Sequence, residues 1–131
     1  MSESALLSNP NPTVLIVDDN PQNAELLAAF LESSQVRLVF ASDGIDAMRA
    51  VTDETPDLIL LDIMMPHMSG FQVCRRLKSN PSTSSIPILM LTALNEPSDI
   101  EYARECGANE FISKPIARAE LNRRVNNLLK R

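Results

Sequence analysis

Short apolar runs alternate with longer amphipathic stretches along most of the chain. The short runs are almost continuously apolar, which is the pattern of strands buried on both faces of a sheet. Five strands are predicted, at residues 13–18, 36–41, 57–62, 86–92 and 109–113. No internal repeat or low-complexity segment interrupts the alternation.

The longer stretches carry apolar residues at helical spacing, so each of them predicts a helix with one apolar face. Pro21 suits the first turn of the first helix, after Asn20. Gly107 predicts the C-cap of the fourth helix. The apolar residues that mark the five helices are Leu26, Leu27, Phe30 and Leu31; Ile45, Ala47 and Met48; Phe71, Val73, Cys74 and Leu77; Ile100, Ala103 and Cys106; and Leu121, Val125, Leu128 and Leu129.

Five repeats of strand and helix predict a doubly wound α/β fold, a (βα)5 sandwich. Consecutive parallel strands need a crossover connection, which is usually a helix and is right-handed. We therefore expect a parallel sheet with helices on both faces. The second strand ends in Ala41 and Ser42 without a charged residue, which suits a strand at the sheet edge.

Polar residues stand where the other four predicted strands end. The carboxyl ends of parallel strands meet at one edge of the sheet, where ligands bind in α/β proteins. Each residue alone has an ordinary explanation, such as a helix cap, a turn or a solvated charge, but their joint position at one edge indicates a site. They are Asp18 and Asp19, Asp62, Thr92, and Lys114 before Pro115.

The three carboxylates indicate the chemistry of this site. Close carboxylates repel and raise one another's pKa, which predicts a hard divalent cation with oxygen ligands from Asp19 and Asp62, and from Asp18 through water. Lys114 supplies further positive charge. A metal that holds phosphate oxygens beside a nucleophilic carboxylate suits phosphoryl transfer.

Composition restricts the class of protein. The 131 residues are 44% hydrophobic, enough for one domain with a single core, and residues 1–12 have the composition of a flexible tail. Only 4% of residues are aromatic and there is no Trp, which disfavours an aromatic-lined cofactor pocket. The net charge of −5 argues against nucleic acid or an anionic membrane as a partner.

Targeting features predict a cytoplasmic protein. The chain start lacks the basic and apolar regions of a signal peptide, and no apolar run is long enough to span a membrane. Cys74 and Cys106 form no CxxC motif and suit buried thiols in a reducing compartment.

Four motifs, in order and at family spacing, resemble those of receiver domains of two-component response regulators. They are "VLIVDDN", "DLILLDIMMPHMSG", "ILMLTA" and "GANEFISKP", and the resemblance covers about residues 13–131. It implies a parallel sheet in the order 2-1-3-4-5. It also implies a regulatory module that catalyses only its own phosphorylation and dephosphorylation.

The resemblance assigns roles to the site residues. It implies that Asp62 accepts a phosphoryl group from a histidine kinase or a phosphotransfer protein. Asp19 and Asp62 would bind Mg²⁺ together with the backbone carbonyl of Met64, and Asp18 would position a metal-bound water. Thr92 and Lys114 would each bind a phosphoryl oxygen, and the Lys114–Pro115 peptide bond would be cis.

Two positions depart from the commonest family pattern. Ser69 stands where the family often has Asp, and Phe111 takes the switch position often held by Tyr. Switching through Phe111 would act by ring packing, because Phe has no hydroxyl; the alternative is an ordinary core aromatic. In the family, the side chains two positions after the phosphoacceptor and two after the Thr influence the access of water to the phosphoryl group. These positions hold apolar Met64 and Leu94 here, so the resemblance implies slow hydrolysis of the phosphorylated form.

Output is expected at the surface of the fourth helix, fifth strand and fifth helix, which would contact a downstream effector that the sequence does not identify or a second copy of the chain. That surface carries Tyr102, Arg104 and Arg118.

Two other functions fit parts of the pattern. A phosphatase of the haloacid dehalogenase type also uses an Asp nucleophile with Mg²⁺, but it needs a second carboxylate two residues later, where this chain has Met64. A flavodoxin-like FMN binder shares the strand order, but its phosphate loop would be replaced here by the acidic "DDNPQ".

Overall fold

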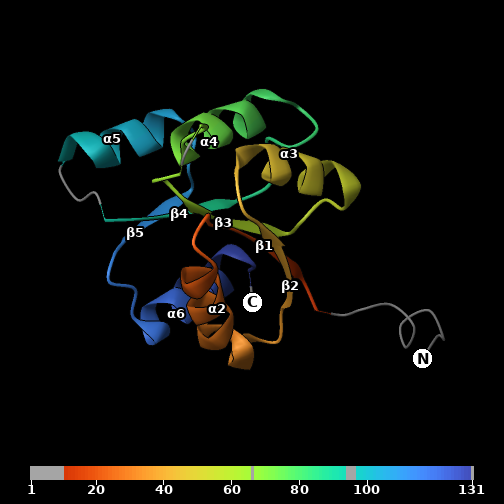
Figure 1. Ribbon diagram of the computed structural model, residues 1–131, viewed down its shortest axis with the longest axis vertical. Helices are drawn as coiled ribbons and strands as arrows, with labels where there is room; N and C mark the ends of the chain where they lie inside the picture. Colours follow the sequence, from red (N-terminus) through yellow and green to blue (C-terminus); the bar gives the residue numbers. More distant parts are fainter. Residues whose placement is uncertain (1–10, 66, 94–96, 131) are drawn as a thin grey trace.

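The computed structural model describes residues 11–65, 67–93 and 97–130. Strands and helices alternate along the described chain, as the hydrophobic pattern predicts (Figure 1). Leu94 and most of the predicted tail, residues 1–12, lie outside the described residues. The elements are β1 (Thr13–Val17), α2 (Pro21–Phe30), η1 (Glu32–Ser34), β2 (Arg37–Ala41), α3 (Gly44–Asp53), β3 (Leu58–Asp62), α4 (Gly70–Ser79), β4 (Ile88–Thr92), α5 (Pro97–Glu105), β5 (Glu110–Ser113) and α6 (Arg118–Leu128).

The five strands form one parallel sheet in the order β2-β1-β3-β4-β5, which confirms the predicted fold. In Figure 1, α3, α4 and α5 lie on one side of the sheet and α2 and α6 on the other. β1 and β3 lie inside the sheet, so all their residues are buried, which explains their almost unbroken apolar sequence.

Alternate strand residues contribute to two separate cores. Leu15 and Leu61 pack into the core beneath α3, α4 and α5. Ile16 and Leu60, one position along, pack into the core beneath α2 and α6. Each fully buried aliphatic side chain of this size stabilises the fold by about 1.5–3 kcal/mol, so the two cores hold the sheet from both faces.

The helix ends explain how the loops at the site are held. Asn20 caps α2 by accepting hydrogen bonds from the backbone N–H groups of Gln22 and Asn23. Ser69 and Gln72 form a capping box at the start of α4. Both caps stand next to strand ends that carry the acidic residues, so they fix where those two loops turn into helices.

Some positions on the predicted helix faces differ from the structure. Leu26 and Ile45 are exposed, although both were expected to face the core. Each stands within two positions of a buried residue on the same helix. Successive helical residues point in directions about 100° apart, so when the neighbouring residue faces the core, Leu26 or Ile45 faces solvent. Cys106 is buried but follows the last residue of α5. Gly107 ends that turn with φ of 97°, as predicted for a helix C-cap.

Candidate functional site

Three carboxylates meet at the carboxyl edge of the sheet. Asp18 and Asp19 directly follow β1, and Asp62 is the last residue of the neighbouring strand β3. One carboxylate oxygen from each lies within 4.8 Å of the others. Asp18 and Asp62 are buried, whereas Asp19 is exposed. The cluster is therefore closed on the protein side and open to solvent at Asp19.

Backbone N–H groups and one ammonium group orient the buried carboxylates. The N–H of Asn20 donates to Oδ1 of Asp18 at 2.9 Å. Oδ1 of Asp62 accepts from the N–H of Met64 at 3.3 Å and lies 3.5 Å from Nζ of Lys114. These contacts hold Asp62 while leaving its other oxygen, Oδ2, outside the hydrogen bonds seen among the described residues.

Burial dominates the electrostatics of the cluster. It raises the pKa of Asp62, and the opposing effects of Lys114 and of the Met64 N–H do not cancel this rise. Burial also raises the pKa of Asp18, with a further contribution from the negative charge of Asp62. A single ammonium group beside three carboxylates leaves net negative charge in a partly buried site. Carboxylate oxygens in this arrangement are ligands that suit a hard divalent cation such as Mg²⁺.

Gly70 is a site-forming residue that the sequence reasoning missed. Its N–H donates to the carbonyl of Ile63 at 2.9 Å, which brings the start of α4 against the end of β3. A Cβ at Gly70 would collide with the carbonyl oxygen of Asp62 and lie 2.7 Å from Cα of Ile63. The available signal was a glycine directly after the Ser69 cap, where a helix former would otherwise be expected.

The remaining predicted residues lie on the neighbouring strands. Thr92 is fully buried at the end of β4, and its carbonyl accepts a hydrogen bond from the N–H of Lys114 at 2.6 Å. The Lys114–Pro115 peptide bond is cis. Phe111, on β5, is partly buried against the core beneath α3, α4 and α5. The fold thus places Thr92 and Lys114 at the strand ends beside Asp62, and Phe111 further back along β5.

In the loop after β3, Met64 and Met65 have different surroundings. Met64 is 60% exposed, so its side chain is not packed into the core beside the acidic cluster. Met65 instead packs against the core beneath α3, α4 and α5. His67 is exposed and has a left-handed backbone conformation with φ of 69°. At the site, Met64 acts through its backbone N–H.

The sequence matches the family model of the response regulator receiver domain over residues 14–126. The chain belongs to this family. Over 115 residues this receiver domain is 43% identical to the response regulator PleD of Caulobacter vibrioides, covering 88% of this chain and 25% of PleD. Other curated relatives are matched over about half of their length. The receiver domain therefore corresponds to a part of these longer proteins.

Solved structures agree with this assignment. A putative response regulator from Chloroflexus aurantiacus is 36% identical, with a TM-score of 0.88, and the match covers 92% of this chain and 99% of that one. The receiver domain of the sensor histidine kinase PA1611 from Pseudomonas aeruginosa is 31% identical, with a TM-score of 0.84 over 92% and 99% of the two chains. The PA1611 structure holds a magnesium ion coordinated in its active site cleft.

These matches do not support the haloacid dehalogenase or flavodoxin alternatives, and the acidic pocket of the receiver domain fits a phosphoacceptor site. Among the residues that the structure describes, no helix combines the length and the apolar character needed to cross a bilayer.

Proposed function

We propose that this receiver domain accepts a phosphoryl group on a carboxylate oxygen of Asp62. The donor would be the phosphohistidine of a histidine kinase or a phosphotransfer protein. The oxygen attacks phosphorus and the phosphorus–nitrogen bond breaks, with its electron pair passing to the imidazole nitrogen, which takes up a proton from solvent. The observation that carries the proposal is the position of Asp62, buried at a strand end between two further carboxylates and an ammonium group.

Magnesium is part of the proposal, and its ligands would be the side chains of Asp19 and Asp62 and the backbone carbonyl of Met64, with Asp18 holding a metal-bound water. The close approach of the three carboxylates supports this assignment. Bound Mg²⁺ would supply positive charge to phosphoryl oxygens. The Met64 N–H orients the Asp62 carboxylate by donating a hydrogen bond to its Oδ1. Because Asp19 is exposed, water bound to the metal would have access to solvent.

Two further residues would bind the phosphoryl group. The Lys114 ammonium, already beside Asp62, would pair with one phosphoryl oxygen, and the Thr92 hydroxyl would donate a hydrogen bond to another. The link between the Lys114 N–H and the Thr92 carbonyl keeps the two strand ends in register. Movement of Thr92 toward the phosphoryl group would be transmitted to Phe111, the proposed switch residue.

The proposed role is regulatory, with no turnover of external substrates. Residues 13–131 would form the receiver domain and residues 1–12 a tail. A cytoplasmic location is consistent with the two free, buried cysteines, because thiols stay reduced in that compartment. The effector-binding or dimer surface would be formed by α5, β5 and α6. A groove there, lined by Ile100, Arg104 and Phe111, supports this choice.

Phosphorylation by acetyl phosphate with Mg²⁺ tests the proposal. Intact mass should rise by one phosphoryl group, and hydroxylamine should remove it because acyl phosphates are labile to this nucleophile. The Asp62→Asn variant should stay unmodified, while Glu105→Gln, with the same charge change on exposed α5, should be modified normally. Wild-type incorporation in Asp62→Asn would show that Asp62 is not the acceptor.

The metal assignment has its own test. Mg²⁺ titration followed by amide chemical shifts should give weak binding that Asp19→Asn weakens further, since few protein oxygens coordinate the ion. Glu105→Gln again serves as the charge-matched control. Unchanged Mg²⁺ affinity in Asp19→Asn would move the metal away from this cluster.

A further inference from the structure

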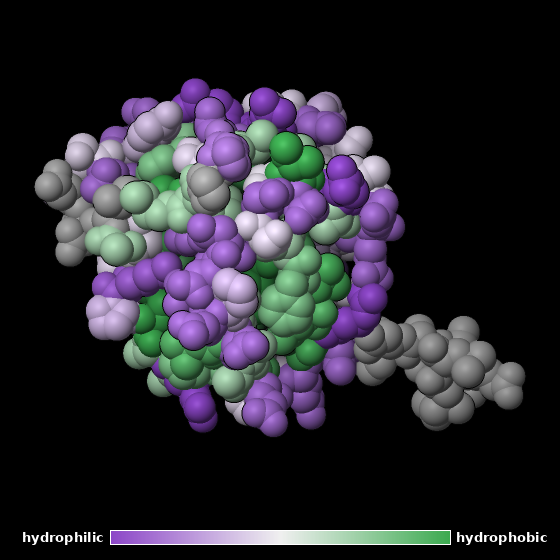
Figure 2. Space-filling view, viewed as in Figure 1, coloured by the Kyte–Doolittle hydropathy of each residue, from purple (hydrophilic) through white to green (hydrophobic). Residues whose placement is uncertain are grey.

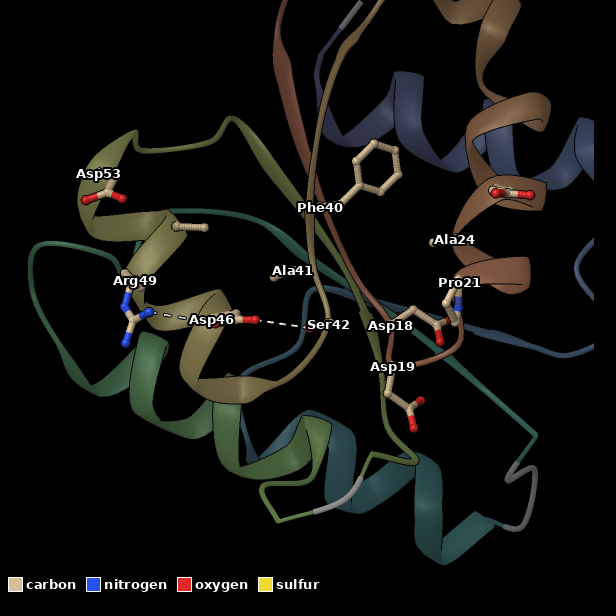
Figure 3. A pocket seen from close by; sticks show the side chains of 12 residues that line it. Asp18, Asp19, Pro21, Ala24, Phe40, Ala41, Ser42, Asp46, Arg49 and Asp53 are labelled. Carbon is tan, nitrogen blue, oxygen red and sulfur yellow. Dashed lines mark hydrogen bonds and ion pairs between the residues drawn. The ribbon is translucent and has the colours of Figure 1, made fainter.

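A groove of about 560 Å³ runs along the outer edge of β2, between α2 and α3 (Figure 3). β2 is the edge strand opposite β5, so this groove lies across the sheet from the proposed output surface. One end of it adjoins the acidic cluster. The lining residues are Asp18, Asp19, Pro21, Ala24, Glu25, Phe40, Ala41, Ser42, Asp46, Arg49, Ala50 and Asp53.

Phe40 gives the groove an apolar centre. Its side chain projects from β2 toward α2 and Ala24, and the residue is 53% exposed. Figure 2 shows a continuous hydrophobic area over the part of the molecule where Figure 1 draws β2. Edge strands are ordinarily protected by charged residues, proline or a covering element. An aromatic ring left half exposed on an edge strand is therefore a candidate contact for another chain.

The charge around this apolar centre is strongly negative. Asp19, Glu25 and Asp53 are exposed carboxylates on three different sides of the groove. Arg49 is the only basic residue among the described residues that line the groove, and its guanidinium faces Asp46 at 4.0 Å. Asp46 also accepts a hydrogen bond from the Ser42 hydroxyl. The groove thus offers more negative charge than its own cation balances.

We propose that this groove binds a basic segment of a partner protein. A large apolar side chain of that segment would cover the Phe40 ring, and flanking lysines or arginines would pair with Asp19, Glu25 and Asp53. Charge complementarity selects this occupant over a second copy of the chain, because the chain itself has a net charge of −5. The apolar centre at Phe40 favours a peptide segment over inorganic cations, because such ions have no apolar side chain that could cover the ring.

The position of the groove links binding to the acidic cluster. Asp18 and Asp19 belong to both, so a bound basic segment and Mg²⁺ would compete for the same negative charge. Only the competition with Mg²⁺ rests on the proposed function; binding of the basic segment to the groove does not. Titrations without Mg²⁺ test the groove by itself, so failure of the metal assignment leaves that test intact.

The experiment is a titration of the isotope-labelled full chain with a short peptide in which leucines are flanked by lysines and arginines. Amide shifts should change at Ala24, Phe40, Ser42 and Asp53. Phe40→Ala should weaken binding by about fivefold to tenfold, because the covered apolar area is lost. Leu26→Ala, a truncation at a 51% exposed residue outside the groove, should leave the affinity unchanged.

Charge variants complete the test. Asp53→Asn should weaken binding, while Glu105→Gln, the same charge change on α5, should not. Equal binding of a peptide with serines in place of leucines would overturn the proposal, since it would show unselective attraction to an acidic surface. Shifts located elsewhere, or concentration-dependent shifts of the groove residues without peptide, would also overturn it; the latter would assign the groove to a second copy.

Discussion

The ammonium nitrogen of Lys114 lies 3.5 Å from Oδ1 of Asp62, beyond the distance of a strong charge-assisted hydrogen bond. The two residues come from strands at different positions in the sheet, separated by β4. Lys114 is therefore close enough to attract Asp62 but does not neutralise the cluster, in which Asp18 and Asp19 carry further negative charge. The site is electrostatically incomplete and favours binding of additional positive charge.

Asp62→Asn should stabilise the metal-free domain at neutral pH. Burial raises the pKa of Asp62, so protonation is favoured in the folded state. The stability that this raised pKa contributes is present below pH 3.8, the ordinary pKa of the carboxyl group. It is lost as the pH rises through the pKa that Asp62 has in the folded state. The neutral amide avoids that loss, and a gain of roughly 1 kcal/mol corresponds to about 3–6 °C in melting temperature.

Thermal unfolding at several pH values checks this expectation. The difference between Asp62→Asn and wild type should disappear below pH 3.8, where the wild-type carboxyl is protonated in both states. Added Mg²⁺ should also reduce the difference by stabilising the wild type. A variant less stable than wild type at pH 7 without metal would contradict the role given to burial.

Lys114→Met should have opposite effects on phosphorylation and metal binding. Phosphorylation should slow because the phosphoryl oxygens lose a cation, whereas Mg²⁺ should bind more tightly because a competing positive charge is gone. The unfolding free energy should fall by roughly 1 kcal/mol without metal. Phosphorylation kinetics and Mg²⁺ titration of this variant and of exposed Lys130→Met give the comparison. Parallel loss of both functions would indicate misfolding.

Gly70→Ala should destabilise the domain more than Gly44→Ala. At Gly70 the added methyl group would meet the backbone of Asp62 and Ile63, which the sheet holds rigidly. At Gly44 it would meet the flexible side chain of Met68. We expect a loss of about 2 kcal/mol or more at Gly70 and a smaller loss at Gly44, measured by urea unfolding. Equal losses would show that the close approach at Gly70 has no special cost.

Met64→Asn should shorten the lifetime of the phosphorylated domain. The thioether of Met64 has no hydrogen-bond donor and is only a weak acceptor, while the amide of Asn at this exposed position can orient a water toward phosphorus. One such hydrogen bond corresponds to about 1.4 kcal/mol, or roughly a tenfold faster hydrolysis. Decay of the phosphorylated mass species measures the rate, with Met64→Leu as the apolar control. Equal decay in all three proteins would reject this explanation.

Phosphorylation should reach Phe111 and the surface of α5, β5 and α6. Beryllofluoride, a mimic of the phosphoryl group, should shift the amide signals of Thr92, Lys114 and Phe111, because only a ligand that binds one conformation better changes the equilibrium. Thr92→Val should abolish the shifts at Phe111 while leaving those around Asp62. Shifts confined to the neighbourhood of Asp62 in the wild type would exclude this route.

The sequence was most informative about those site residues whose position in the fold follows from where a strand ends. Asp18, Asp62 and Lys114 could be placed together because each stands at or directly after the last residue of a strand, and parallel strands end at one edge. Gly70 could not be found this way, since its role depends on how the loop after β3 folds back on Ile63. The exposure of Leu26 depended on the exact rotation of α2 against the sheet.

The groove along β2 was beyond sequence reasoning for a related reason. Ala24, Phe40 and Asp53 lie on three different elements, and each looks ordinary in its own segment. Only the packing distances of α2 and α3 from the sheet edge determine whether Phe40 is covered. Those distances follow from the combined volumes of many side chains, which no local pattern encodes.

Tyr102 makes the domain suitable for label-free spectroscopy. It is the only tyrosine in a chain without Trp, so nearly all intrinsic fluorescence comes from one ring. That ring stacks on Phe71 with centroids 4.5 Å apart, and the Arg75 guanidinium lies 5.6 Å from its centroid. Its emission therefore reports on the contact between α4 and α5, and stopped-flow fluorescence can follow in real time whether events at Asp62 disturb that contact.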